Sequence, residues 1–148
     1  MGFMDSLSIS ASGLTAERLR MDVTANNLAN VNTTRTAAGG PYRRQQVVFT
    51  PAGASFGDML GAAMGDSAGG SLHGVQVQGV VPDNSPMKRV YEPGHPDADA
   101  QGYVTMPNVD TVTEMVDMMG ATRAYEADVT AINAAKAMAE KALEIGHV

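Results

Sequence analysis

The sequence predicts an α+β fold, in which long N- and C-terminal helices pair as an antiparallel coiled-coil-like stem with a small antiparallel β unit between them. Two observations predict it. Apolar residues recur at helical spacing near both ends of the 148-residue chain. All 7 Pro and most of the 16 Gly lie in the middle. We therefore divide the chain into an N-terminal helix at 1–33, a small β domain at 34–107 and a C-terminal helix at 108–148, with a Gly-rich loop at about 51–74 inside the β domain.

The first helix is predicted from about Met4 to Val31. Its apolar side chains recur every seven residues, which is the spacing of a helix that packs along one face. These residues are Leu7, Leu14, Met21 and Leu28. The Asn-rich sequence that follows Ala25 is typical of a helix that ends in a turn.

The middle segment contains stretches that read as β-strands. Val-rich or alternating patterns predict strands at Gln45–Thr50, Val75–Val81, Lys88–Tyr91 and Tyr103–Met106. The Gly/Ala/Ser-rich stretch between the first two contains apolar residues that fit either a short amphipathic helical turn or a loop. These residues are Phe56, Met59, Leu60, Ala63 and Met64.

The last helix is predicted from about Asn108 to Ile145, followed by Gly146 as a stop signal. Thr111 and Glu114 fit a capping box at its start, with Asp110 as the alternative cap. An apolar stripe is predicted to run along the helix and to face the first helix. Its members are Val112, Met115, Val116, Met119, Tyr125, Val129, Ile132, Ala139 and Leu143.

Two narrow stripes bury too little apolar surface to offset the entropy of ordering both helices. We therefore expect the terminal helices to be largely disordered alone and to fold when other subunits cover them. The small side chains of the last helix, such as Ala121 and Ala131, would let other helices approach closely. The alternative is that the helices simply cover the chain's own core.

Composition and motifs argue against several classes of function. The net charge of −6 disfavours nucleic-acid binding, and the chain has no Cys for disulfides, thiolate metal sites or a Cys nucleophile. No nucleophile elbow or phosphate loop is present, and the three His are scattered. The loop 97–102 resembles the start of a calcium-binding loop, but Pro107 and Asn108 stand at its last two positions, where the bidentate Glu is needed. We predict no catalytic residue, cofactor, metal or small-molecule substrate.

The end motifs and middle strands together resemble the flagellar rod and hook family. Five residues near the end of the first helix match the signature of the wider family: Asn26, Asn27, Leu28, Ala29 and Asn30. A second group, around the predicted strands, is similar to the basal-body rod subunits of that family: Tyr91, Pro93, Gly94, Asp97, Asp99, Gly102 and Tyr103.

This resemblance implies a non-enzymatic structural subunit of the proximal rod of the bacterial flagellar basal body, which polymerises through its terminal helices and helps to transmit torque. The implied partners are copies of itself, other rod proteins, ring and export-gate components, and the type III export apparatus. Because no cleaved secretory signal or apolar run of about 18 residues is visible, we expect export to the periplasmic rod without a signal peptide. The alternatives are another rod-family subunit and, in a different class, a soluble coiled-coil adaptor or chaperone.

Overall fold

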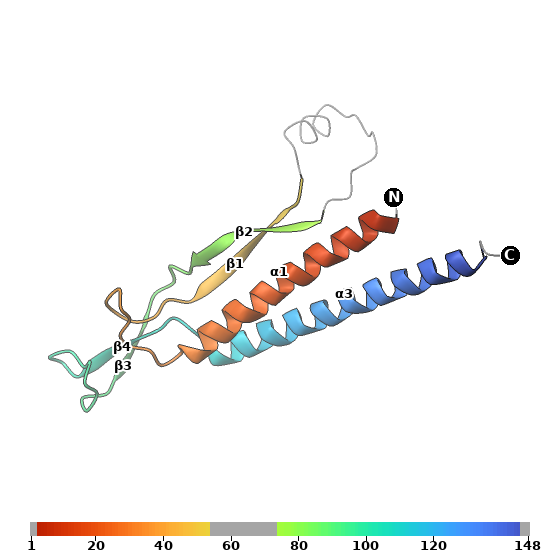
Figure 1. The fold of residues 1–148 in the computed structure, drawn as a ribbon. Helices are drawn as coiled ribbons and strands as arrows, with labels where there is room; N and C mark the ends of the chain where they lie inside the picture. Colours follow the sequence, from red (N-terminus) through yellow and green to blue (C-terminus); the bar gives the residue numbers. More distant parts are fainter. Residues whose placement is uncertain (1–2, 54–73, 146–148) are drawn as a thin grey trace, which may run out of the picture. The chain divides into compact units, whose positions relative to one another are not determined.

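The computed structural model describes residues 3–53 and 74–145 (Figure 1). Within these ranges the elements follow one another as α1 (Phe3–Ala29), β1 (Gln45–Pro51), β2 (Val75–Pro82), β3 (Lys88–Tyr91), β4 (Tyr103–Met106) and α3 (Thr111–Ile145). The predicted α+β class and all four predicted strands are confirmed, with β1 and β2 each one residue longer than expected. The possible helical turn near Phe56 lies outside the described residues.

Helix α1 ends at Ala29, two residues before the predicted end, in bonds made by its Asn residues. The backbone N–H of Asn30 donates to the carbonyls of Asn26 and Asn27. The Asn30 side-chain amide also donates to the Asn26 carbonyl over 2.9 Å and to the Asn26 side-chain oxygen over 2.7 Å. The backbone and side-chain N–H groups of Asn30 thus donate hydrogen bonds to carbonyls that would otherwise have no partner in the last turn of the helix.

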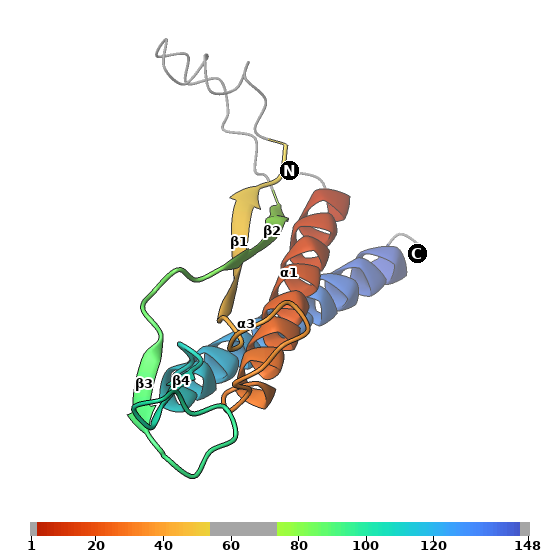
Figure 2. The same ribbon diagram turned by 90° about the vertical axis from the view of Figure 1, so that its left-hand side faces the viewer.

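The four strands form two separate two-stranded sheets. Strands β1 and β2 are antiparallel, because Ala52 N–H bonds the Gly74 carbonyl at one end and Asp83 N–H bonds the Arg44 carbonyl at the other, both at 2.7 Å. Strands β3 and β4 are also antiparallel, in a register that pairs each residue of Lys88–Tyr91 with one of Tyr103–Met106. Val104 of β4 is fully buried. Figure 2 shows the two sheets as separate pairs of strands, β1 with β2 and β3 with β4.

Helix α3 is capped by Asp110, so the predicted Thr111–Glu114 capping box is wrong. The Asp110 carboxylate accepts bonds from the backbone N–H of Thr113 at 3.2 Å and from its hydroxyl at 2.6 Å. The first helical bond runs from Glu114 N–H to the Asp110 carbonyl. The Glu114 side chain therefore does not reach back to a cap, and instead lies in the interior with 1% of its surface exposed.

The chain divides into two compact units, each built from parts of both helices and of the middle segment. In the described residues, one unit comprises 3–18, 49–53, 74–78 and 123–145. The other comprises 19–48 and 79–122. The boundaries predicted at residues 33 and 107 stay a prediction, since this division follows contacts rather than the order of segments along the chain.

Helix–helix contacts occur inside each unit, and they show that α1 and α3 run antiparallel. In the first unit, Gly13 lies against the carboxylate of Asp128. In the second unit, Thr122 donates to the sulfur of Met21 at 3.6 Å, and Asn27 bonds Glu114 at 2.9 Å. Later residues of α1 thus meet earlier residues of α3, as the predicted stem requires.

The buried interior is small and partly polar. Among the described residues, the buried apolar side chains are Ala16, Val23, Val104, Ala121 and Ala135, and the buried polar ones are Thr24, Asn27 and Glu114. The largest fully buried side chain is a carboxylate rather than an aromatic or aliphatic group. Several large apolar residues of the helices are exposed and therefore contribute little to this interior.

Candidate assembly interface

Four apolar residues on the first turns of α3 face away from the buried side of the helix. We call Val112, Met115, Val116 and Met119 the outer stripe; their exposed fractions are 69%, 50%, 57% and 54%. They follow the i, i+3, i+4, i+7 spacing of one helical face, opposite the buried Glu114 and Ala121. Isolated exposed apolar residues are ordinary, whereas a continuous exposed apolar stripe of this kind is a candidate interaction surface.

The remaining members of the predicted C-terminal stripe lie on a different face of α3. Tyr125, Val129, Ile132 and Ala139 are half-buried, whereas Leu143 is exposed near the helix end. The step of six residues from Met119 to Tyr125 turns the helix by about 240°, so the pattern passes from the outer face to the α1-facing one. The single stripe expected from the sequence is thus two surfaces, and the assembly role of its residues stays a prediction.

On α1 the predicted heptad residues Leu7, Leu14, Met21 and Leu28 are half-buried. The sulfur of Met21 contacts Thr122 of α3. The buried positions of α1 are Ala16, Val23, Thr24 and Asn27. The assembly role of the heptad residues stays a prediction.

A second exposed apolar group lies at the far ends of the two helices, within the first unit. Met4 belongs to the start of α1, and Met138, Leu143 and Ile145 to the end of α3, and all four side chains are mostly exposed. This helix-end group belongs to the first unit, whereas the outer stripe belongs to the second. Leu143 lies about 140° from Met138 around the axis of α3, so the group does not form a single face.

At the buried end of the stem lies a polar cluster centred on Asn27, which we call the Asn27 cluster: Asn27, Tyr42, Arg44, Gln45 and Glu114. The Asn27 amide nitrogen donates to the Gln45 carbonyl at 2.8 Å and to a Glu114 carboxylate oxygen at 2.9 Å. Its oxygen accepts from the Tyr42 hydroxyl and from Gln45 N–H, both at 2.9 Å. Every hydrogen-bonding position of this buried amide is occupied, which only an amide side chain can achieve here.

Arg44 supplies the positive charge that Glu114 needs in the interior. Its guanidinium bonds Glu114 directly, bonds Asp117 at 3.0 Å and lies 3.7 Å from Asp83. Burial lowers the pKa of Arg44, but the bond with Glu114 and the charges of Glu114, Asp117 and Asp83 outweigh it and raise the pKa overall. Burial and the negative charge of Glu114 likewise raise the pKa of Tyr42, so its hydroxyl stays a donor.

Sequence reasoning named Asn27 through the family motif but missed Glu114 as its partner and Arg44 as the cation that pairs with Glu114. The available signal was the spacing of Glu114, which precedes the buried Ala121 by seven residues and therefore shares its helix face. A carboxylate on that face requires a cation, and Arg44 follows the matched motif by only a short loop.

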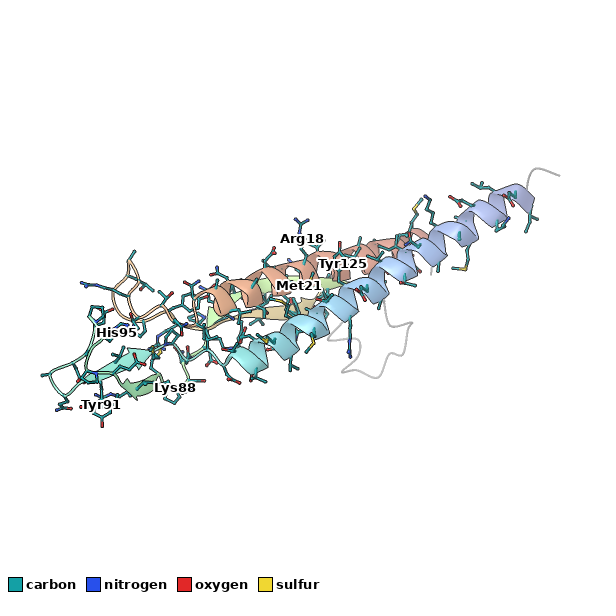
Figure 3. All side chains as sticks on the ribbon, turned by 90° about the horizontal axis from the view of Figure 1, so that it is seen from below. Arg18, Met21, Lys88, Tyr91, His95 and Tyr125 are labelled. Carbon is teal, nitrogen blue, oxygen red and sulfur yellow. The ribbon has the colours of Figure 1, made fainter. Side chains whose placement is uncertain are left out.

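The second group of family-motif residues lies in the β3–β4 hairpin, which Figure 3 shows with Lys88, Tyr91 and His95 labelled. The rings of Tyr91 and Tyr103 meet edge to face, with centroids 5.2 Å apart. Arg89 stacks 5.1 Å from the Tyr103 centroid and bonds Asp99 at 2.7 Å. Gly102 has a φ of +81°, and a Cβ there would lie 2.9 Å from the Tyr91 ring. This turn therefore requires Gly.

The acidic side chains of the loop 97–102 bond to the protein itself. Asp97 accepts the Thr34 hydroxyl at 2.8 Å. Asp99 accepts the N–H groups of Gln101 and Tyr103, both at 2.9 Å, and these bonds together with Arg89 lower its pKa. Within 3–53 and 74–145, no three His, Asp or Glu side chains gather in a way that could hold a metal ion. No helix in the same ranges is long and apolar enough to cross a bilayer.

Comparison with known proteins connects these features to one family. The family "Flagella basal body rod protein" matches residues 7–35, and "Flagellar basal body rod FlgEFG protein C-terminal" matches residues 100–145. The flagellar basal-body rod protein FlgC of Bacillus subtilis is 50% identical over 95% of this chain and 96% of its own length. The chain belongs to the FlgC family of flagellar basal-body rod proteins. Its relatives in Borreliella burgdorferi (46% identity, 98% of both chains) and Salmonella typhimurium (42% identity, 99% of this chain and 100% of the relative) agree.

Membership of the FlgC family makes this chain a structural, non-enzymatic subunit of the flagellar basal-body rod. A rod is built from several subunits, so the chain assembles with other rod proteins. The matched ranges include Asn27 and most of α1 on one side and all of α3, with the outer stripe, on the other. The alternative of a soluble adaptor or chaperone is thereby set aside.

Proposed function

We propose that this subunit polymerises through its terminal helices in the proximal part of the rod, where the packed helices help to transmit torque. The observation that carries the proposal is the outer stripe, an apolar face on α3 that the described chain leaves exposed. Covering four such side chains is favourable by roughly 1.5–3 kcal/mol for each one fully buried. A neighbouring helix is the simplest partner, because helical ridges fit the grooves between the stripe residues.

The small side chains of α3 support the role in torque transmission. Ala127, Ala131, Ala134 and Ala137 are exposed and would allow other helices to approach at short interaxial distance. Interfaces packed at the density of a protein interior deform little under load. A tube of such helices would resist twisting.

The proposed partners are further copies of this chain, other rod proteins, ring and export-gate components of the basal body, and the export apparatus during secretion. Exposed apolar residues occur both on the outer stripe and at the helix ends, which supports contacts with more than one neighbour.

The test is Val116→Asp, with Val80→Asp on β2 as the matched control. Both valines are exposed in the described chain, so neither change should unfold the monomer. A charge at Val116 would have to be desolvated when the stripe is covered, which is strongly unfavourable. We expect cells with Val116→Asp to lose rods and swimming while the protein is still secreted, and cells with Val80→Asp to swim. Normal swimming of the Val116→Asp strain would contradict the proposal.

A further inference from the structure

Two close contacts between α1 and α3 repeat at the same interval along both helices. Asn27 meets Glu114 in one unit, and Gly13 meets Asp128 in the other. Gly13 precedes Asn27 by fourteen residues, and Glu114 precedes Asp128 by fourteen, which is two heptads on each helix. The antiparallel register is therefore the same in both places, and each contact includes a carboxylate of α3.

The buried apolar residues of the interface are few and small. Those of α1, Ala16 and Val23, are seven apart, and those of α3, Ala121 and Ala135, are fourteen apart. A slip of one heptad exchanges Ala16 for Ile9 or Val23, whereas on α3 it puts Glu114 or Asp128 in the place of Ala121. A heptad repeat of apolar residues by itself specifies register weakly unless a polar group is added.

Surface charge opposes only one of the two slips. In the observed register Arg20 lies 3.8 Å from Asp117. A slip of one heptad would put Asp110 in the place of Asp117 in one direction and Ala124 in the other. Only the first slip would therefore retain an ion pair at this position.

Neither slipped register can form the Asn27 cluster. Only the observed register puts Glu114 next to both the Asn27 amide and the Arg44 guanidinium. A slip would leave Asn27 with an unfilled donor in the interior. A buried polar group without its partner costs about 1–3 kcal/mol, and a charged one costs more.

We propose that the Asn27 cluster specifies the antiparallel register of α1 and α3, while contributing little net stability. Buried ion pairs often add little over apolar replacements, because desolvation offsets their attraction. Their best-attested use is to select one register among several. This inference rests on the contacts within the chain and does not depend on the proposed function.

The chain has no Cys, so introduced thiols report register without background. Met21→Cys with Thr122→Cys joins positions whose side chains touch in the observed register. Met21→Cys with Met115→Cys, or with Val129→Cys, reports a slip of one heptad in either direction. Seven residues displace the second thiol by about 10.5 Å along the helix, which is too far for a disulfide without a slip. Intramolecular disulfides in dilute full-length protein are counted by mass spectrometry.

With the Asn27 cluster intact, we expect the observed-register disulfide to exceed either slipped one by more than about tenfold. In an Asn27→Leu/Glu114→Leu background, we expect retained helix content and a Met21–Met115 pair of thiols that forms its disulfide within a few-fold of the observed-register one. Arg44 keeps Asp117 and Asp83 as partners there, so no cation is left unpaired. Val23→Ala is the control: it removes buried apolar volume and should lower stability without changing the ratio.

Three results would overturn the inference. One is equal cross-linking of observed and slipped pairs when the cluster is intact. Another is an unchanged preference in the Asn27→Leu/Glu114→Leu background. The third is loss of folding in that background, which would make the cluster a source of stability rather than of register.

Discussion

Asn27 and Glu114 are 87 positions apart in the sequence, yet the Asn27 amide donates to the Glu114 carboxylate over 2.9 Å inside the second unit. Both side chains are almost fully buried, at 1% exposure each. The bond joins the last turns of α1 to the first turn of α3. The guanidinium of Arg44, which directly precedes β1, neutralises the charge of the Glu114 carboxylate. A family-motif asparagine thus has a definite structural role, to bind a carboxylate in the interior.

Asn27→Asp should destabilise the protein by about 2–4 kcal/mol, because it removes two donors and places a second carboxylate beside Glu114. Urea unfolding followed by circular dichroism measures the change. Asn26→Asp is the matched control: the Asn26 side-chain oxygen only accepts a bond from Asn30, and a carboxylate can do the same. Equal stability of the two variants would show that the Asn27 bonds do not matter.

Acid should weaken the cap of α3. Bonds from the side chain and backbone of Thr113 lower the pKa of Asp110 below its ordinary value of 3.8. A carboxyl whose folded pKa is lowered contributes stability above its unfolded pKa, and this is lost as the pH falls through the folded pKa. Asp110→Asn keeps a capping side chain that does not titrate. We expect its stability to fall less steeply than that of the wild type between about pH 4 and pH 2. Identical slopes in urea titrations would argue against this cap.

Gly102→Ala should lower the melting temperature, whereas Gly94→Ala should not. Residue 102 has a left-handed φ of +81° and faces the Tyr91 ring, so a Cβ meets both strain and a clash. The strain alone costs roughly 1–2 kcal/mol. A Cβ at Gly94, in the same hairpin, would meet nothing within 4 Å. Thermal unfolding of the two variants side by side tests this, and the reverse order of stability would refute the turn geometry.

Ile132→Asp should abolish rod assembly and swimming while leaving secretion of the subunit possible. Ile132 is half-buried on the α1-facing side of α3, so a charge there would disturb the stem itself. Secreted protein in the culture medium and swimming on soft agar are the two measurements. A fully motile Ile132→Asp strain would count against helix packing as the basis of assembly.

The sequence alone predicted features that depend on local pattern, and it missed those that depend on a distant partner. The strands Lys88–Tyr91 and Tyr103–Met106 have the predicted bounds, because Pro and Gly residues delimit them in the chain. Glu114 was assigned to a capping box because its bonds to Asn27 and Arg44 depend on how the chain folds back.

The sequence also left open which partner each helix face contacts. A helical repeat shows that a face exists, but it does not show which of two partners that face will meet. Val116 and Ile132 were therefore placed on one stripe, although the first is exposed and the second is half-buried. The structure separates them because α1 occupies only one side of α3.

The central claim is that neighbouring rod subunits cover the outer stripe. A single introduced thiol, Val116→Cys, tests it directly, since the chain has no other thiol. We expect rapid alkylation in the free subunit and at least about tenfold slower alkylation in isolated basal bodies, because a packed interface excludes the reagent. Equal alkylation rates of Val116→Cys in the free and assembled states would contradict the account.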